Sequence, residues 1–262
     1  MHHALLWQHR FFEFLFFHGL PLQANLLQPI YIPDEEIEAD RQLVRCNEKL
    51  GNDLTRIKNR IKGLLYQLGI KLPDNFSNSN WSNHFIKWLK ELELKNSSAR
   101  IALNHQLQMV EFIRKEKLLV LKDIRALLKK ERYSVIAKYL ISVPSIGPIT
   151  TITMLTEIDD IKRFSNFERL NSFIGFYPSQ FSSGEHIHQG SMIGRQHKRL
   201  RSLIIEAAWT VVRADPAMTM AYNEYKLKVG GKRAIIKIAR KLLSRIRHVW
   251  MNQQIYEKGV VQ

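Results

Sequence analysis

The sequence predicts a mainly α-helical protein with a large basic surface. Apolar residues recur at intervals of three and four over long stretches, as they do on one face of an amphipathic helix. Only one short segment has the β-branched, proline-bounded character of a strand. Hydrophobic residues make up 45% of the 262 residues, which is enough to form a real core. The charge is unbalanced, since 40 Lys and Arg stand against 24 Asp and Glu for a formal net charge of +16.

The basic excess indicates a polyanionic partner, because basic side chains release counterions when they neutralise phosphates. A surface that is basic only for solubility is the alternative. Cys46 is the single cysteine, which excludes an internal disulfide framework or a cysteine-based zinc site and indicates a reducing compartment. The most hydrophobic run, residues 11–20, contains Glu13 and is too short to span a bilayer. We expect a cytoplasmic protein without membrane contact.

The N-terminal third predicts one strand and one long helix. Residues 29–33 are β-branched with a proline at each end, which is typical of a strand at a sheet edge. Three acidic residues at 34–36 favour the positive end of a helix, which Gly69 then ends. The helix seam has one polar member, Asn47, which either fixes the register of a partner helix or lies exposed at the helix edge. The seam consists of Leu43, Asn47, Leu50, Leu54, Ile57, Ile61, Leu64 and Leu68.

A connector rich in Asn and Ser follows over residues 71–98, with a short helix at 81–92. A second long helix is predicted over residues 98–130. Its apolar positions are Leu103, Leu107, Val110, Ile113, Leu121, Ile124 and Leu128. Two seamed helices joined by a connector predict an antiparallel coiled-coil arm. Because such arms often dimerise, we expect a homo-oligomer, either a dimer or a tetramer.

Residues 135–158 predict a helix, a tight turn and a second helix. Pro148 follows the turn at the first helical position, where a missing N–H costs nothing. This order is typical of a helix-hairpin-helix, in which a phosphate approaches the turn glycine and binds the free N–H groups of the second helix. The residues expected to contact DNA here are Ser145, Gly147, Ile149 and Thr150. An ordinary pair of helices without a ligand is the alternative.

The next segment predicts a short helix and then a loop. Residues 165–168 form a capping box for a helix that ends near Phe173, ahead of a terminating Gly175. The loop extends over 177–192, with room for a short hairpin, and contains Ser182 and Ser183 just before Gly184. A nucleophilic serine needs exposure and nearby cations, and this turn offers the exposure alone. His186 and His188 could act as a base or bind a metal, but surface histidines show the same spacing.

The stretch from residue 195 to 247 carries most of the basic surplus on two helices. One has its apolar stripe over 200–211 and stops at Asp215, and the last begins after Gly231. Lys237, Lys241 and Arg245 recur every four residues and are expected on one outward face, where like charges favour a phosphate partner. The basic residues expected to contact DNA are Arg195, Lys198, Arg199, Arg201, Lys232, Arg233, Lys237 and Lys241.

Four segments in this order resemble the C-terminal transposase domain of the insertion sequence 110 family. They are LISVPSIGPITTITMLTEIDDIKRFSNFERLNSFIGFYPS, SSG, KRLRSLIIEAAW and GGKRAIIKIARKLL. The resemblance covers about residues 136–256 and extends more weakly to 26–70. Members of that family are recombinases of mobile insertion sequences, guided by a structured RNA. The resemblance therefore implies DNA binding, DNA recombination and transposition, with DNA and a structured guide RNA as partners.

The resemblance also implies a RuvC-like domain with four acidic Mg²⁺ ligands, a coiled coil, and a helical domain with a catalytic serine. That serine maps to Ser183, with Ser182 as the second candidate, and it would attack a DNA phosphodiester to form a covalent intermediate. In this chain the first two acids would lie before residue 1, and Glu13 is the only acid within 7–16, where the last pair is expected. We therefore expect a truncated member in which the Mg²⁺ ligands are missing, and we assign no metal ligand.

The implied domains are a remnant of the RuvC-like domain at 1–34, the coiled-coil helices with their connector at 35–130, and the transposase domain at 131–262. Three hypotheses follow. The chain is a transposase that uses Ser183 within a multimer, or a catalytically inactive truncated transposase that binds only nucleic acid and partner protomers. The third hypothesis is an unrelated structural protein that binds nucleic acid through its hairpin and basic helices.

Overall fold

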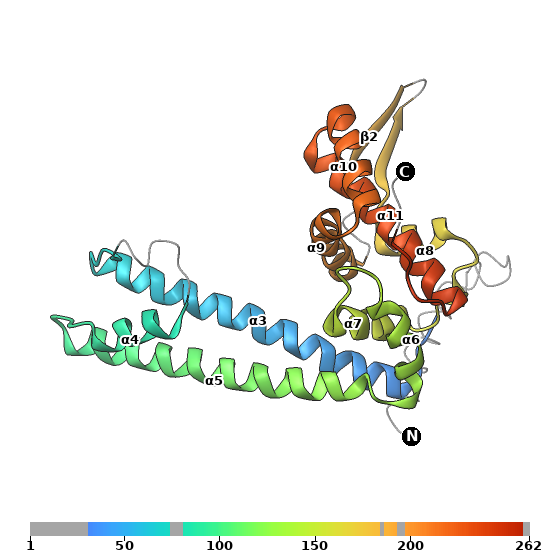
Figure 1. Ribbon diagram of the computed structural model, residues 1–262. Helices are drawn as coiled ribbons and strands as arrows, with labels where there is room; N and C mark the ends of the chain where they lie inside the picture. The colour runs from blue at the N-terminus through green and yellow to red at the C-terminus, as the bar shows by residue number, and fades with distance from the viewer. Residues whose placement is uncertain (1–30, 74–80, 184–185, 193–196, 259–262) are drawn as a thin grey trace, which may run out of the picture. The chain divides into compact units, whose positions relative to one another are not determined.

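The computed structural model describes residues 31–73, 81–183, 186–192 and 197–258, and for the strands between 178 and 192 it describes the backbone alone (Figure 1). The chain divides into two units, 1–35 and 36–262, and apart from Glu35 every element below lies in the second. The described part is mainly helical, which confirms the predicted fold class. None of the helices in these ranges is long and apolar enough to cross a membrane.

In the described ranges the chain forms helices and one two-stranded sheet. The helices are α3 (Glu35–Gln67), α4 (Asn83–Glu91), α5 (Ser97–Leu127), α6 (Glu131–Ile141), α7 (Pro148–Ile158), α8 (Phe167–Ile174), α9 (Lys198–Ala214), α10 (Pro216–Val229) and α11 (Gly231–Asn252). A short 3-10 helix, η2 (Ile161–Arg163), precedes α8. Two antiparallel strands, β1 (Pro178–Ser183) and β2 (His186–Met192), form a hairpin between α8 and α9 in the sequence.

The strand predicted over residues 29–33 does not form in its described part. Residues 31–34 have no regular secondary structure, and residues 29 and 30 lie outside the described ranges. The physical reason lies in the two prolines that bound the segment. Each lacks an N–H, so the segment offers few donors to a strand ladder.

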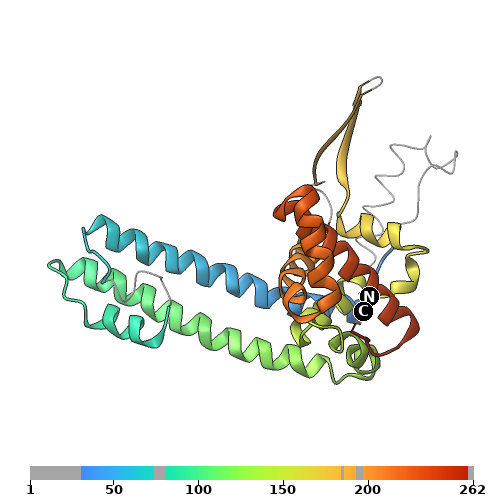
Figure 2. The same cartoon turned by 45° about the horizontal axis from the view of Figure 1, so that its top comes forward.

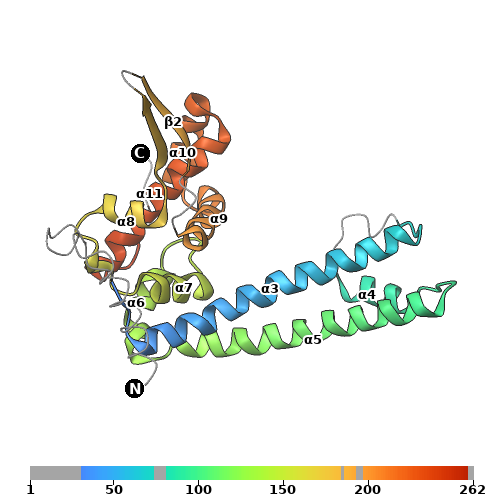
Figure 3. The same cartoon turned by 180° about the vertical axis from the view of Figure 1, so that it is seen from behind.

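The two long helices run antiparallel and lie side by side in all views, as Figure 1, Figure 2 and Figure 3 show. The short helix α4 completes a hydrophobic cluster with them. Its buried members are Ile57, Ile61 and Leu65 of α3, Phe85, Ile86 and Leu89 of α4, and Leu103, Leu107, Val110 and Ile113 of α5. The predicted long helices and short connector helix are thus confirmed, while the coiled-coil packing stays a prediction.

The buried face of α3 differs from the predicted seam. Leu43 and Leu64 are only half-buried, whereas their neighbours Val44 and Leu65 are buried. Val44 belongs to the core of the C-terminal helices, and Leu65 belongs to the cluster that contains α4. One helix therefore packs against different partners at its two ends, which rotates its buried face away from a single seam.

The predicted capping box is shifted by one residue. The Oδ1 atom of Asn166 accepts a hydrogen bond from the Arg169 N–H at 2.9 Å, so Asn166 and not Ser165 is the N-cap of α8. An Asn side chain caps a helix as well as a Ser side chain does. Gly175 ends the helix with φ 88°, in the left-handed region, as predicted.

The C-terminal helices share one large core, through which α11 passes (Figure 3). Its members include Leu140 of α6, Ile152 of α7, Ile204 of α9, and Ile238 and Leu242 of α11. Helix α10 was not among the predicted helices. Only Met218 and Ala221 of α10 are buried, so its sequence has no apolar stripe to indicate a helix.

Candidate nucleic-acid interface

The turn between α6 and α7 is held by buried residues on one side and faces open space at Gly147. Val143 and Ile146 are buried in the core, and Ser145 between them has φ 73°, in the left-handed region. The N-cap of α7 is Gly147, which provides no side-chain hydrogen bond, and Pro148 begins the helix. The amide groups of Ile149 and Thr150 therefore lie in the first turn, where helix N–H groups have no partner within the helix. This geometry matches the predicted helix, turn and helix.

Gly147 faces open space. A Cβ built on it meets no atom within 4 Å, and its φ of −88° is accessible to any residue. Neither packing nor backbone geometry therefore requires a glycine here. A ligand that approaches the turn closely would require one, because a methyl group would separate a phosphate from the first-turn amides.

We expect Gly147→Ala to lower affinity for duplex DNA about tenfold, the effect of one lost phosphate contact at 0.1 M salt. The cost in folding stability should be about 1 kcal/mol, because Ala is a much weaker N-cap than Gly. Fluorescence anisotropy and thermal unfolding measure the two quantities. Gly63→Ala is the matched control, since Gly63 also faces open space but lies on α3. Equal affinities of the two variants would exclude a phosphate contact at the turn.

The segment that follows α11 contacts the residue just before the turn through Tyr256. The Oγ atom of Ser142 donates a hydrogen bond to the Tyr139 carbonyl at 2.6 Å and accepts one from the Tyr256 N–H at 2.8 Å. The Tyr256 hydroxyl in turn contacts the Asp215 carboxylate, which also pairs with Arg245. The segment after α11 thus connects the turn with the N-cap of α10.

Ser182 and Ser183 lie in β1 and not in an irregular loop. Ser183 is the last residue of the strand, and its Cα pairs with that of His186, while Ser182 pairs with Ile187. His188 pairs with Phe181 further along the hairpin. The hairpin thus brings the backbone of His186 opposite Ser183. The catalytic role of either serine stays a prediction, since the structure describes only their backbone.

Five of the predicted basic residues are exposed, as the prediction requires. They are Lys198, Lys232, Arg233, Lys237 and Lys241. Within the described residues none of them has an acidic partner at ion-pair distance, and the ammonium of Lys237 lies 5.0 Å from the ring centroid of Tyr225. Arg195 lies outside the described ranges. Because uncompensated cations on a folded surface favour anionic partners, these five remain candidates for phosphate contact.

Arg245 does not belong to the outward stripe of Lys237 and Lys241. Its Nη1 lies 2.9 Å from Oδ2 of Asp215, whose side chain is fully buried. Burial alone would raise the pKa of Asp215, but the hydrogen bond from Tyr256 and the charge of Arg245 outweigh it and lower that pKa. The expectation that Arg245 faces outward is therefore wrong, because a buried carboxylate takes up its charge.

A buried carboxylate, Glu157 near the end of α7, joins three elements. Arg45 of α3 donates two hydrogen bonds to it, from Nε to Oε1 at 2.8 Å and from Nη2 to Oε2 at 2.7 Å. Arg199 of α9 donates from Nη1 to Oε1 at 3.2 Å, and the Nε2 of His197 lies 3.3 Å from Oε2. The Glu157 side chain has no exposed surface, so these three groups replace water around it.

The cations determine the charge state of Glu157. Burial alone would raise its pKa, since burial penalises the charged form. Hydrogen bonds from His197 and Arg45, together with the charge of both groups, outweigh burial and hold the pKa of Glu157 well below its ordinary value. The ionised carboxylate therefore fixes the first half of α3 against α7 and α9. The one hint in the sequence is that Glu157 is the single acid in an otherwise apolar and hydroxyl-bearing helix.

Two predicted DNA contacts are engaged inside the protein. Arg199 also pairs with Glu48 through Nε at 2.6 Å and donates to the Val44 carbonyl at 3.2 Å. Arg201 is buried and donates from Nη1 to the Gly175 carbonyl at 3.1 Å. We therefore leave both out of the surface that we propose to contact DNA. Their basic character alone could not distinguish an internal pair from a free charge.

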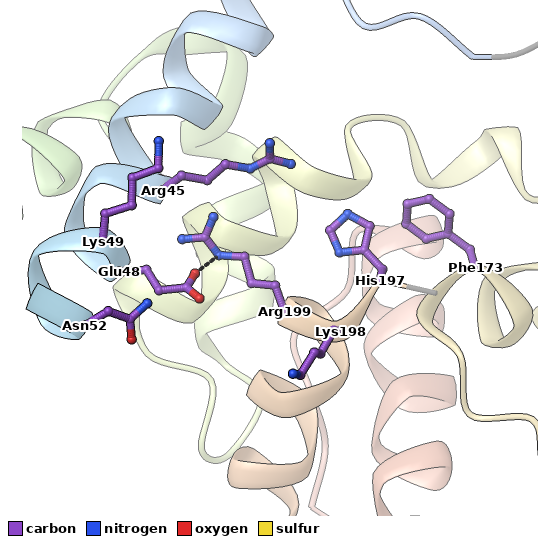
Figure 4. A pocket seen from close by; sticks show the side chains of 8 residues that line it. All are labelled: Arg45, Glu48, Lys49, Asn52, Phe173, His197, Lys198 and Arg199. Atoms are coloured by element: carbon purple, nitrogen blue, oxygen red, sulfur yellow. Dashed lines mark ion pairs between the residues drawn. The ribbon is translucent and has the colours of Figure 1, made fainter. Parts of the chain in front are cut away.

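An open pocket of about 560 Å³ lies between α3 and the start of α9. Figure 4 shows side chains from α3 on one side, those of the α9 start on the other, and the ion pair of Arg199 with Glu48 between them. The sequence did not predict this pocket, because its two walls are far apart in the chain. The lining residues are Arg45, Glu48, Lys49, Asn52, Phe173, His197, Lys198 and Arg199.

The described residues do not fit the Mg²⁺ site that the resemblance implies. Within these ranges no group of three or more His, Cys, Asp or Glu side chains could hold a metal ion. Residues 7–16, including Glu13, lie outside the described ranges. No chemical step is therefore assigned to a metal.

The fold and the site define a class: a basic, mainly helical protein with an open helix hairpin, features that are typical of nucleic-acid-binding proteins. Comparison with known families narrows this class. Residues 137–223 match the model of the transposase IS116/IS110/IS902 family, so this part of the chain is similar to those transposases.

Individual relatives agree with the family match. The chain is 25% identical over 189 residues to "Putative transposase y4qE" of Sinorhizobium fredii, an alignment that covers 72% of this chain and 44% of the relative. It is 22% identical over 190 residues to the transposase for insertion sequence element IS1111A of Coxiella burnetii, with coverages of 70% and 48%. An insertion element IS110 protein of 43.6 kDa from Streptomyces coelicolor is 23% identical over 270 residues, with coverages of 84% and 65%. The chain thus spans about half the length of the first two relatives.

Proposed function

We propose that the chain is a transposase of an insertion sequence, a DNA recombinase that cuts and rejoins DNA with Ser183 as its nucleophile. The observation that carries the proposal is the family match over residues 137–223, which includes the hairpin turn, β1, β2 and α9. The exposed lysines of α11 and the open turn at Gly147 support it, since both offer positive groups to a phosphate backbone. A homo-oligomer and a structured guide RNA complete the proposal, as the resemblance implies.

The proposed reaction is a transesterification. The Ser183 oxygen forms a bond to a DNA phosphorus, and the bond from that phosphorus to one strand oxygen breaks. The serine hydroxyl gives up its proton as its bond to phosphorus forms, and the released strand oxygen takes up a proton to become a hydroxyl, while the other end stays attached to the serine. Attack by the hydroxyl of a second strand reverses these steps and frees Ser183.

Binding and covalent capture test the proposal together. We expect the affinity for duplex DNA to fall steeply with salt, with a slope of about −5 in log K against log salt if six phosphates are neutralised. Incubation with DNA that carries the element ends, with and without the guide RNA, should leave a protein–DNA adduct that survives denaturation. Binding without an adduct is the result that the catalytically inactive alternative predicts. An affinity that does not change with salt would contradict both.

A further inference from the structure

We infer that the pocket between α3 and α9 binds a phosphodiester segment of a nucleic-acid strand, at a second site distinct from the hairpin turn. Four of its eight lining side chains are cationic and one is acidic. A volume of about 560 Å³ lies in the range of sites that take a whole small ligand, so a nucleotide fits there as well as a single anion does. The inference rests on the proposed function, because it assumes that nucleic acid is the partner.

The charges in the pocket divide into two groups. Arg45 and Arg199 are neutralised by Glu157 and Glu48, and they form the fixed wall. Lys49 and Lys198 are exposed, and within the described residues neither has an acidic partner at ion-pair distance. The ammonium groups of these two lysines are therefore the free positive charges in the pocket, one on each side (Figure 4).

The other lining groups suit a phosphodiester and its attached base. The Asn52 side chain is exposed and can donate from its amide to a phosphate oxygen. On the opposite side the rings of Phe173 and His197 lie 5.0 Å apart at 46°, which provides an aromatic edge to the pocket. Aromatic edges beside cationic grooves are typical of sites that hold single strands, because every base has an apolar face.

Two side chains of the pocket wall already have partners inside the protein before any ligand binds. The buried Glu157 carboxylate accepts hydrogen bonds from Arg45 and Arg199, and Arg199 also donates to the Val44 carbonyl at 3.2 Å. A preformed wall lowers the entropy cost of binding, since fewer side chains must be ordered. A basic wall that is fixed in this way favours binding of a strand in one defined conformation.

The test compares two double variants with the same change in charge. Lys49→Glu with Lys198→Glu reverses the two free charges of the pocket, while Arg60→Glu with Lys122→Glu reverses two exposed charges on the arm. Glu at the first position of α9 suits the helix dipole, so we expect the pocket variant to fold. Anisotropy is measured with duplex DNA, single-stranded DNA and single-stranded RNA at several salt concentrations.

We expect the pocket variant to bind at least one of the three probes about a hundredfold more weakly at 0.1 M salt, tenfold for each lost phosphate contact. The salt slope for that probe should flatten by about two. The probe that is affected identifies the strand type. Photo-crosslinking of that probe, substituted with 5-iodouracil, should label peptides within residues 45–52 or 197–199.

These measurements distinguish a failure of the proposed function from a failure of the pocket inference. If the wild type binds no nucleic acid, the proposed function fails. If it binds with normal salt dependence but the pocket variant matches the arm variant for all three probes, the pocket inference alone is overturned. Crosslinks confined to other helices would also overturn it.

Discussion

Ser183→Ala should reduce the covalent protein–DNA adduct by a factor of at least about 10³, while DNA affinity stays within about twofold of the wild type. Removal of a nucleophile typically abolishes the chemical step without removing the binding contacts. Denaturing gels with labelled DNA measure the adduct, and anisotropy measures binding. Because Ser183 is the last residue of β1, we expect the change to leave the strand backbone unaltered.

Ser182→Ala is the matched control, since the two serines are neighbours in the same strand. The adduct should persist in that variant. If the adduct were lost in Ser182→Ala but persisted in Ser183→Ala, Ser182 would be the nucleophile. An adduct that persists in both variants would exclude either serine as the nucleophile.

Glu157→Gln should lower the free energy of unfolding by about 3 kcal/mol. Removal of one partner from a buried ion pair typically costs 3–5 kcal/mol, at about the low end here because Arg45 is a third exposed. The substitution keeps the shape of the side chain but removes the ion-pair partner of Arg45 and leaves Arg199 with Glu48 alone. Chemical denaturation at neutral pH measures the change.

The control for this variant is Glu224→Gln, which breaks an exposed pair with Lys228 in which both side chains are more than half exposed. Exposed pairs of this kind contribute little to stability, because water and salt screen them. A similar stability of the two variants would contradict the role assigned to Glu157.

The same carboxylate makes stability depend on pH. In the folded protein the pKa of Glu157 is lowered, so its contribution is fully present above the ordinary glutamate value of about 4.3. As pH falls below that value, the unfolded state takes up a proton more readily than the folded state, and the contribution decreases. The difference in stability between wild type and Glu157→Gln should therefore be present at neutral pH and shrink below about pH 4. A difference that grows in acid would contradict the assigned ion pairs.

The helices were predictable where one apolar stripe repeats along the whole helix. α5 and α11 have such stripes, and so the sequence located them closely. α10 has none, because it buries only Met218 and Ala221 and is held by its cap at Asp215. Its Asp-Pro start looked like the end of the preceding helix and not the beginning of a new one.

The turn at Gly147 was predictable from the sequence, but the pocket between α3 and α9 was not. Gly147 and Pro148 mark the start of α7 through residue types that are typical of the N-cap and of the first helical position. A pattern of neighbouring residues is enough to predict such a local feature. The pairing of Glu157 with Arg45 and Arg199 joins residues that lie 112 and 42 positions apart. No local pattern records such a pairing, so basic residues that are already neutralised looked the same as free ones.

The hydrogen bond from the Tyr256 N–H to Ser142 has a consequence for the order in which the protein matures during synthesis. The hairpin is translated more than a hundred residues before the segment that holds it. A nascent chain on the ribosome therefore has the turn but lacks its anchor, and the turn becomes fixed only after the last helix has emerged. The turn that we propose to bind phosphate therefore takes its final conformation late, once the residues after α11 have been translated.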